Sequence, residues 1–284
     1  SVIPLQSAWG VAMKIFIERI NEYAGKPMDE KDFAEVVNST VKGVRAIFRK
    51  AKSEDIREDV TDLLQTFRDL AVGKEPSAKI GYMTLKKYAK YMKAPHRMDL
   101  AVSAITKEGA WHCNRRCLHC YAADQSYAEG KELSTDEWKR AIDACRRAGI
   151  PALTFTGGEP TLRSDLAELI GYSKWFVTRL NTNGALLTIE LCKKLSKASL
   201  DSVQITLYSS NEEVHNMLVG CDGFRETVQG IKNALGAGLD VSVNTPLCSL
   251  NREYAETVKF LLALGVRYFS CSGLIPAGNA EKDD

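Results

Sequence analysis

Apolar and polar positions follow two different periods along this chain of 284 residues, and the period changes near residue 100. Before that point apolar side chains recur every three or four positions, as they do at Phe33, Val37, Val41, Val44 and Phe48. This spacing is typical of amphipathic helices. We therefore expect an all-helical N-terminal region over residues 1–97.

From residue 98 onward short apolar runs alternate with helical patterns. The expected strands are, in chain order, 100–105, 152–156, 176–181, 202–207, 241–246 and 268–274. Strand–helix alternation predicts parallel strands joined by right-handed crossovers. Six such units predict an α/β fold over residues 98–284, a partial (β/α)6 TIM-like barrel whose function lies at the carboxyl ends of the strands.

Local signals mark the helices between these strands. Ser134 and Glu137 form a capping-box pattern at the start of a helix that runs through Cys145, and Thr188 is placed to cap a helix that runs to Leu195. Two further helices are expected over 226–235 and 254–264, each followed by glycine. The helical pattern thus fills the gaps that parallel strands require.

Charge and composition exclude several classes of protein. Lys and Arg number 38 against 36 Asp and Glu, so the net charge of +2 calls for no nucleic-acid partner. No apolar run reaches the 18 residues of a membrane span, although a segment rich in Tyr and Lys at 82–93 leaves peripheral membrane contact open. The N-terminus lacks a secretory pattern and the eight cysteines are mostly scattered, so we expect a cytoplasmic location.

Three of the cysteines are exceptional, because Cys113, Cys117 and Cys120 follow the spacing C-x3-C-x2-C with no fourth cysteine nearby. A [4Fe–4S] cluster normally takes four thiolates, so three ligands leave one iron open to a group that is not protein. The triplet alone is also compatible with structural zinc, for which His112 or His119 would be the fourth ligand. Both metal centres stay open on this motif.

Two more loops follow expected strands. Gly157-Gly158-Glu159-Pro160 ends the second strand, and Asn183 ends the third. Paired glycines let the backbone approach a ligand closely, and the Glu159 carboxylate could accept a hydrogen bond from an ammonium group. Each loop alone is weak evidence for a site, because Gly-Gly turns are common and a plain turn is the usual interpretation.

Taken together, these motifs resemble those of the radical S-adenosylmethionine (SAM) enzymes, over about residues 100 to 280. The three cysteines match the cluster motif of that family, and Gly157-Gly158-Glu159-Pro160 matches its motif for the SAM amino group. The resemblance therefore implies a [4Fe–4S] cluster and SAM as cofactors, with Cys113, Cys117 and Cys120 as the iron ligands.

The same resemblance assigns further SAM contacts, at Tyr121, Asn183, Thr206, Asn244 and Ile275. The chain also departs from the family pattern. A common Ser-Leu-Asp-Gly reads Thr206-Leu207-Tyr208-Ser209 here, so Tyr208 either replaces the absent aspartate or packs. The following His215 is interpreted as a loop-structuring residue rather than a base.

The chemistry implied by the resemblance is reductive cleavage of SAM to methionine and a 5′-deoxyadenosyl radical, which abstracts hydrogen from a substrate. An electron donor such as ferredoxin or flavodoxin is then expected as a partner. We expect apolar strand side chains, among them Val203 and Val243, to form a rigid wall around the radical.

The substrate is open at this point. A ribosomal peptide or protein is our first choice, and maturation of a small-molecule cofactor such as a haem precursor is the alternative. A non-catalytic iron–sulfur electron-transfer or scaffold protein is a hypothesis from another class. Cys248 and Cys271 are candidate hydrogen donors, unless they are packing residues. Many relatives continue into a C-terminal auxiliary-cluster domain, and the resemblance leaves open whether such a domain follows Asp284 here.

Overall fold

The computed structural model describes residues 94–95, 97–104, 112–123 and 130–282. Almost all of the expected helical region lies outside these residues, so its structure and the boundary at residue 97 stay predictions. Nearly all of the described residues belong to one compact unit of the chain, formed by Asp99–Ile142, Leu153–Lys174 and Thr178–Asp284.

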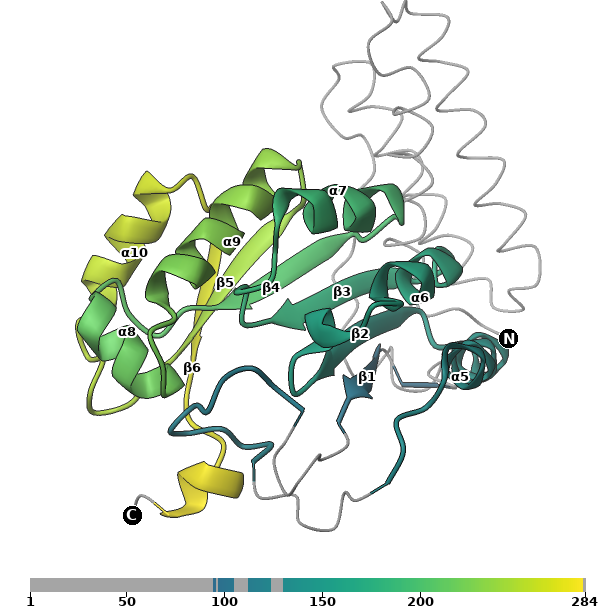
Figure 1. The fold of residues 1–284 in the computed structure, drawn as a ribbon, viewed down its shortest axis with the longest axis horizontal. Helices are drawn as coiled ribbons and strands as arrows, with labels where there is room; N and C mark the ends of the chain where they lie inside the picture. The colour runs from purple at the N-terminus through teal and green to yellow at the C-terminus, as the bar shows by residue number, and fades with distance from the viewer. Residues whose placement is uncertain (1–93, 96, 105–111, 124–129, 283–284) are drawn as a thin grey trace, which may run out of the picture. The chain divides into compact units, whose positions relative to one another are not determined.

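Six strands form one sheet, and their order in the sheet is their order in the chain. The strands are β1 (Arg97–Ser103), β2 (Ala152–Gly157), β3 (Val177–Thr182), β4 (Ser202–Thr206), β5 (Val241–Pro246) and β6 (Tyr268–Ser272). The pairs β3–β4, β4–β5 and β5–β6 are parallel. The prediction of an α/β fold with a partial TIM-like barrel is confirmed (Figure 1).

Helices connect the strands, as the sequence pattern predicts. They are α5 (Thr135–Ala148), α6 (Leu166–Tyr172), α7 (Ile189–Lys197), α8 (Glu212–Val219), α9 (Phe224–Gly236) and α10 (Tyr254–Ala263), with short 3₁₀ turns η1 (Pro160–Leu162) and η2 (Gly278–Lys282). The sequence did not predict α6 and α8. Each has two turns or so, which is too short for a helical period to be recognised.

The expected helix caps are present. The Ser134 backbone N–H and hydroxyl both donate to the Glu137 carboxylate at 2.8 Å, and the Glu137 N–H donates to the Ser134 hydroxyl at 3.4 Å, so both halves of a capping box are present at the start of α5. The Thr188 hydroxyl accepts from the backbone N–H of Leu191 and caps α7. These local interactions fix where each helix begins.

Side chains alternate across the sheet. Along β5, Val241, Val243 and Thr245 are buried while Ser242 and Asn244 are only partly so. The helix α9 packs on β4 and β5 and covers the apolar side. The expectation that Val203 and Val243 wall the site is therefore wrong, since strand residues of the opposite parity, such as Gln204 and Asn244, line the cavity described below.

Close packing brings α9 onto the loop after β3. A Cβ atom at Gly230 of α9 would lie 2.0 Å from the Gly184 carbonyl oxygen, so only glycine fits there. The Thr227 hydroxyl of the same helix donates to the Asn183 carbonyl at 3.0 Å. The loop that carries Asn183 is thus held by a helix.

No helix in the described part of the chain has the length and apolar character that crossing a bilayer needs.

Candidate functional site

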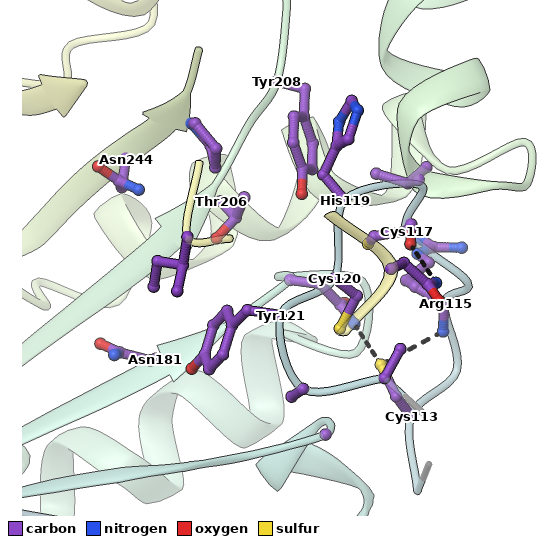
Figure 2. Close-up of a pocket in the computed structure, with 18 of the residues that line it drawn as sticks. Cys113, Arg115, Cys117, His119, Cys120, Tyr121, Asn181, Thr206, Tyr208 and Asn244 are labelled. Atoms are coloured by element: carbon purple, nitrogen blue, oxygen red, sulfur yellow. Dashed lines mark hydrogen bonds between the residues drawn. The ribbon is translucent and has the colours of Figure 1, made fainter. Parts of the chain in front are cut away.

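A cavity of about 480 Å³ lies at the carboxyl ends of the strands, with the cysteine loop on its rim (Figure 2). Its volume falls in the range of small-molecule sites. The cavity brings together ten of the side chains and glycines predicted from sequence: Cys113, Cys117, Cys120, Tyr121, Gly157, Gly158, Asn183, Thr206, Asn244 and Ile275. Glu159, Pro160, Cys248 and Cys271 are not among the residues that line it.

The cysteine loop is seated on the end of α8. The backbone N–H groups of Arg116 and Leu118 donate to the Val219 and Leu218 carbonyls at 3.1 and 2.9 Å. Gly220 ends the helix in the left-handed region with φ of 70°, and a Cβ atom there would lie 2.4 Å from the Arg116 carbonyl oxygen. A helix end therefore fixes the backbone from which the three thiols project.

Burial makes the three thiols hard to ionise without a metal. It raises the pKa of Cys117 to about 12, and the neighbouring Cys120 and Cys113 add to the effect. Burial also raises the pKa values of Cys113 and Cys120. Metal binding to such a site has to displace protons from the thiols, because the thiolate is the ligand.

The three thiols along one cavity suit a cluster that leaves one iron open. Within the described ranges, no group of three or more His, Cys, Asp or Glu side chains is arranged to hold one metal ion. Zinc bonds of about 2.3 Å would bring three sulfurs to within about 3.8 Å of one another. A cubane instead binds each thiolate through a different iron, so its ligands are spread around a larger body.

The Gly157–Gly158 turn connects the loop after β2 to the end of β1 and to the cysteine loop. Gly157 has φ of 146°, and a Cβ atom there would lie 2.6 Å from the Ser103 hydroxyl at the end of β1. The Gly158 N–H donates to the Ser103 carbonyl at 2.9 Å, and the Glu159 N–H donates to the His112 carbonyl at 3.0 Å. The two glycines therefore face the cavity with backbone only, next to the cysteine loop.

The Glu159 carboxylate is already hydrogen-bonded to other residues of the protein. It is 1% exposed and accepts from the Thr161 hydroxyl and N–H, the Thr182 hydroxyl at 2.7 Å and the Asn183 N–H at 2.8 Å. Burial raises the pKa of Glu159, while these donors act in the opposite direction. The adjacent Pro160 is buried in η1. The expectation that this carboxylate is free to accept from a ligand therefore needs correction, because its position lies behind the cavity wall.

The strand side of the cavity is a surface of uncharged polar side chains. Asn181 and Gln204 are register partners on β3 and β4, and Thr206 and Asn244 are partners on β4 and β5. The Asn244 amide donates to the Ser272 hydroxyl at 3.1 Å. Asn181 and Gln204 were not predicted as contacts, although Gln204 lies two positions before Thr206 on the same face of β4 and Asn181 lies two positions before Asn183.

The two candidate hydrogen donors lie outside the cavity wall. Cys248 packs against the small apolar cluster of Tyr208, Leu218 and Val219. Cys271 is exposed on β6, on the face opposite to Ser272, which lines the cavity. Since neither thiol lines the site, we do not retain the assignment of these cysteines as hydrogen donors.

Arg115 is a further residue that the sequence analysis did not identify. Its guanidinium is buried, donates to the Cys221 sulfur at 3.0 Å and forms an ion pair with Glu226 in the first turn of α9. A Cβ atom at Gly223 would lie 2.8 Å from the guanidinium carbon. The Arg115 side chain thus joins the cysteine loop to the α8–α9 connection at Cys221 and to the first turn of α9 at Glu226. In the sequence, the acidic residue in the first turn of α9 is the one sign of this ion pair.

His215 has the loop-structuring environment that was expected of it. It is fully buried, and its Nδ1 accepts a hydrogen bond from the Tyr208 backbone N–H at 3.3 Å. Burial, with the nearby Arg115 second, lowers its pKa to about 4. A neutral histidine that accepts from the backbone holds the turn after β4.

The model of the radical SAM superfamily matches residues 112–262, which is more than half of the chain. The chain belongs to the radical SAM superfamily. Membership implies an iron–sulfur cluster and SAM, which the three thiols and the adjoining cavity are suited to hold.

Two curated relatives illustrate the range of this superfamily. The chain is 34% identical over 176 residues to an AdoMet-dependent heme synthase of Methanosarcina barkeri, a match that covers 61% of this chain and 50% of the relative. It is 36% identical over 157 residues to a probable GTP 3′,8-cyclase of Thermococcus kodakarensis, which covers 54% of this chain and 51% of the relative. The matched part of this chain thus spans about half the length of these relatives.

Among solved structures, SuiB of Streptococcus suis bound to the precursor peptide SuiA has a TM-score of 0.57 with this chain at 18% identity. The match covers 76% of this chain and 45% of SuiB. At this identity the likeness concerns the fold alone, and it agrees with the six-stranded architecture.

Proposed function

We propose that this radical SAM enzyme abstracts hydrogen from a peptide or protein substrate bound over the cavity at the carboxyl ends of the strands. The observation that carries the proposal is the composition of that cavity. Three thiols lie on one side of it, and neutral amides and hydroxyls lie on the other. The first group suits a cluster, and the second suits a ligand that is rich in amide groups.

In this proposal Cys113, Cys117 and Cys120 hold the cluster and leave one iron without a protein ligand. When bound, the cluster supplies the electron that cleaves the sulfonium C–S bond of SAM and so generates the 5′-deoxyadenosyl radical. Gly157 and Gly158 leave room for the co-substrate because they present only backbone to the cavity. Asn183, Thr206, Asn244, Tyr121 and Ile275 are the proposed SAM contacts.

Glu159 takes a different role in this proposal from the one expected. Its carboxylate accepts hydrogen bonds from residues after β2 and from residues at the end of β3. We infer that it acts on SAM binding indirectly, because it holds the Gly157–Gly158 loop and the Asn183 loop in one arrangement. The backbone of these loops then orients the co-substrate.

The neutral wall supports a peptide over a porphyrin substrate. Asn181, Gln204 and Asn244 give this wall neutral amide groups, although Gln204 accepts from Arg179 at 3.4 Å and Asn244 bonds to Ser270 and Ser272. A haem precursor carries several carboxylates, which call for cationic partners. Of the described lining residues, the arginines are Arg115 and Arg116, whose guanidinium groups already bond to Glu226 and to backbone carbonyls of the cysteine loop.

A second candidate function is maturation of a cofactor such as a haem precursor. The likeness to the heme synthase of M. barkeri supports this alternative. In either case we propose a cytoplasmic enzyme that receives its electron from a donor such as ferredoxin or flavodoxin.

The test uses the anaerobically reconstituted and chemically reduced protein with SAM. We expect methionine and 5′-deoxyadenosine in equal amounts, measured by chromatography. We also expect a pool of short unmodified peptides to raise the yield of 5′-deoxyadenosine, and we expect the mass of some of these peptides to change. Iron coproporphyrin should have neither effect. Stimulation by the porphyrin instead would favour the second candidate, and no SAM cleavage would overturn both.

A further inference from the structure

Arg179 is a cation on the inner face of the sheet, next to the strand side of the cavity. It lies on β3 two positions before Asn181, which lines the cavity, so both residues are on the same face of the strand. Its register partner on β4 is Ser202, whose small side chain leaves room for a long one. The Arg179 side chain therefore lies among polar residues, although it does not itself line the cavity.

The guanidinium of Arg179 bonds to a neutral group. One of its N–H groups donates to the side-chain oxygen of Gln204 at 3.4 Å. Within the described residues no carboxylate forms an ion pair with Arg179, although the side chain is partly buried. Charges that are removed from water are normally paired with an opposite charge. An anion bound next to Gln204 would supply that charge.

The contact with Arg179 also fixes which way the Gln204 amide is turned. A guanidinium has donors only, so the atom of Gln204 that faces it is the carbonyl oxygen. The N–H₂ of this amide is then the part that remains to bond a ligand in the cavity, which Gln204 lines together with its register partner Asn181. An amide whose oxygen accepts from a cation is polarised, so its N–H groups become stronger donors.

This part of the cavity lies across from the thiols. Figure 2 shows Asn181 and Thr206 on the strand side and the three cysteines of the cluster motif on the other side. The Asn244 amide on the strand side already bonds to two serines of β6. A group anchored at Gln204 would thus be held away from the cluster, and the rest of its molecule would extend across the cavity.

We propose that Gln204, supported by Arg179, binds a carboxylate of the peptide substrate and so selects peptides that carry one. Gln204 donates an N–H to a carboxylate oxygen, and Arg179 is a positioning residue that orients this amide and supplies positive charge behind it. The carboxylate belongs to an acidic side chain or to the C-terminus of the peptide. The inference rests on the proposed function, because it requires a peptide in the cavity.

The experiment compares three pools of synthetic peptides of equal length. The acidic pool contains Glu and has amidated C-termini, the neutral pool has Gln in place of every Glu, and the third pool is the neutral pool with free C-terminal carboxylates. The concentration of each pool that gives half-maximal formation of 5′-deoxyadenosine is measured with reconstituted and reduced protein and SAM. We expect the wild type to need about tenfold less of a pool with the recognised carboxylate than of the neutral pool, as for one hydrogen bond to a charged group.

Three variants test the residues. Arg179→Gln keeps a donor for Gln204 but removes the charge, so the preference for a carboxylate should disappear. Gln204→Glu should pair with Arg179 and present oxygens to the cavity, so the preference should reverse. Arg140→Gln, on the exposed side of α5, is the matched control and should keep the wild-type preference. Each preference compares pools on one protein, so a smaller folded fraction in a variant does not change it.

A preference of the wild type for the acidic pool or for the third pool supports the proposal, and also shows whether a side chain or the chain end is bound. The proposal is overturned if the wild type responds equally to all pools, or if Arg179→Gln or Gln204→Glu keeps the wild-type preference. If no pool raises the yield of 5′-deoxyadenosine above that with SAM alone, the proposed peptide substrate is itself refuted, and this inference with it.

Discussion

The backbone N–H of Asn183 donates a hydrogen bond of 2.8 Å to the buried carboxylate of Glu159, and this bond joins the loop after β3 to the loop after β2. Both loops line the cavity, but the carboxylate that joins them does not. The relationship changes how the glutamate of the glycine motif is interpreted, because it acts on the site through the shape of the two loops.

Glu159→Gln should lower the free energy of unfolding by about 1–3 kcal/mol, since an amide N–H₂ would replace one accepting oxygen and meet a backbone or hydroxyl donor. SAM affinity should fall as well, because the loops would no longer be held together. Urea unfolding and equilibrium binding measure the two effects. Glu168→Gln, on the exposed side of α6, is the matched control. Equal stability of Glu159→Gln and the wild type would contradict the role given to this carboxylate.

The ion pair of Arg115 and Glu226 gives a second prediction. Removal of one partner leaves the buried guanidinium without its carboxylate, so Glu226→Ala should cost about 1–3 kcal/mol of stability. Replacement of Arg115 by Met in the same protein should restore part of the loss, since no buried charge then remains. A double-mutant cycle by urea unfolding checks this. Additive losses would show that the two side chains do not interact.

The cysteines separate into ligands and others. Cys117→Ser should abolish the iron–sulfur absorption and the cleavage of SAM, because the remaining two thiols cannot hold the cluster. Cys271→Ser is the control, since that thiol is exposed on β6 and does not line the cavity. It should keep cluster and product formation near wild-type levels. A selective loss of substrate product in Cys271→Ser would restore it as a hydrogen donor.

His215 predicts a pH dependence of stability. Its folded-state pKa of about 4 lies below the ordinary value near 6.5, so the unfolded chain binds the proton first as the pH falls. The stability that neutral His215 contributes is complete above pH 6.5 and is lost as the pH falls toward 4. Between pH 7.5 and 5.5 the loss should be about 1 kcal/mol.

The comparison for that prediction is His215→Asn, whose side-chain oxygen keeps an acceptor for the Tyr208 N–H without titrating. Unfolding in urea at pH 7.5 and at pH 5.5 gives the difference for both proteins. The wild type should lose more stability than His215→Asn over this interval. An identical loss in the two proteins would mean that His215 titrates normally.

Local patterns were enough to predict most of the fold. The strands β5 and β2 lie within one residue of the predicted ranges, and the caps at Ser134 and Thr188 come from interactions between residues three positions apart. The helices α6 and α8 were missed because about two turns carry too few apolar positions to define a period. The three cysteines and the glycine turn could be identified because their spacing is itself the signal.

The sequence by itself determined the alternation of strands and helices, the cysteine triplet and the family, since each depends on residues close together in the chain. Only the tertiary structure decided that the Glu159 carboxylate bonds to other residues instead of facing the cavity, and that Cys271 points away from the cavity. It also decided that amides and hydroxyls line the strand side of the cavity. It also packed Cys117 against the buried cluster that contains Tyr208, 91 positions further along the chain. Such contacts depend on how the strands pair and how the helices pack, which bring together residues that are far apart in the chain.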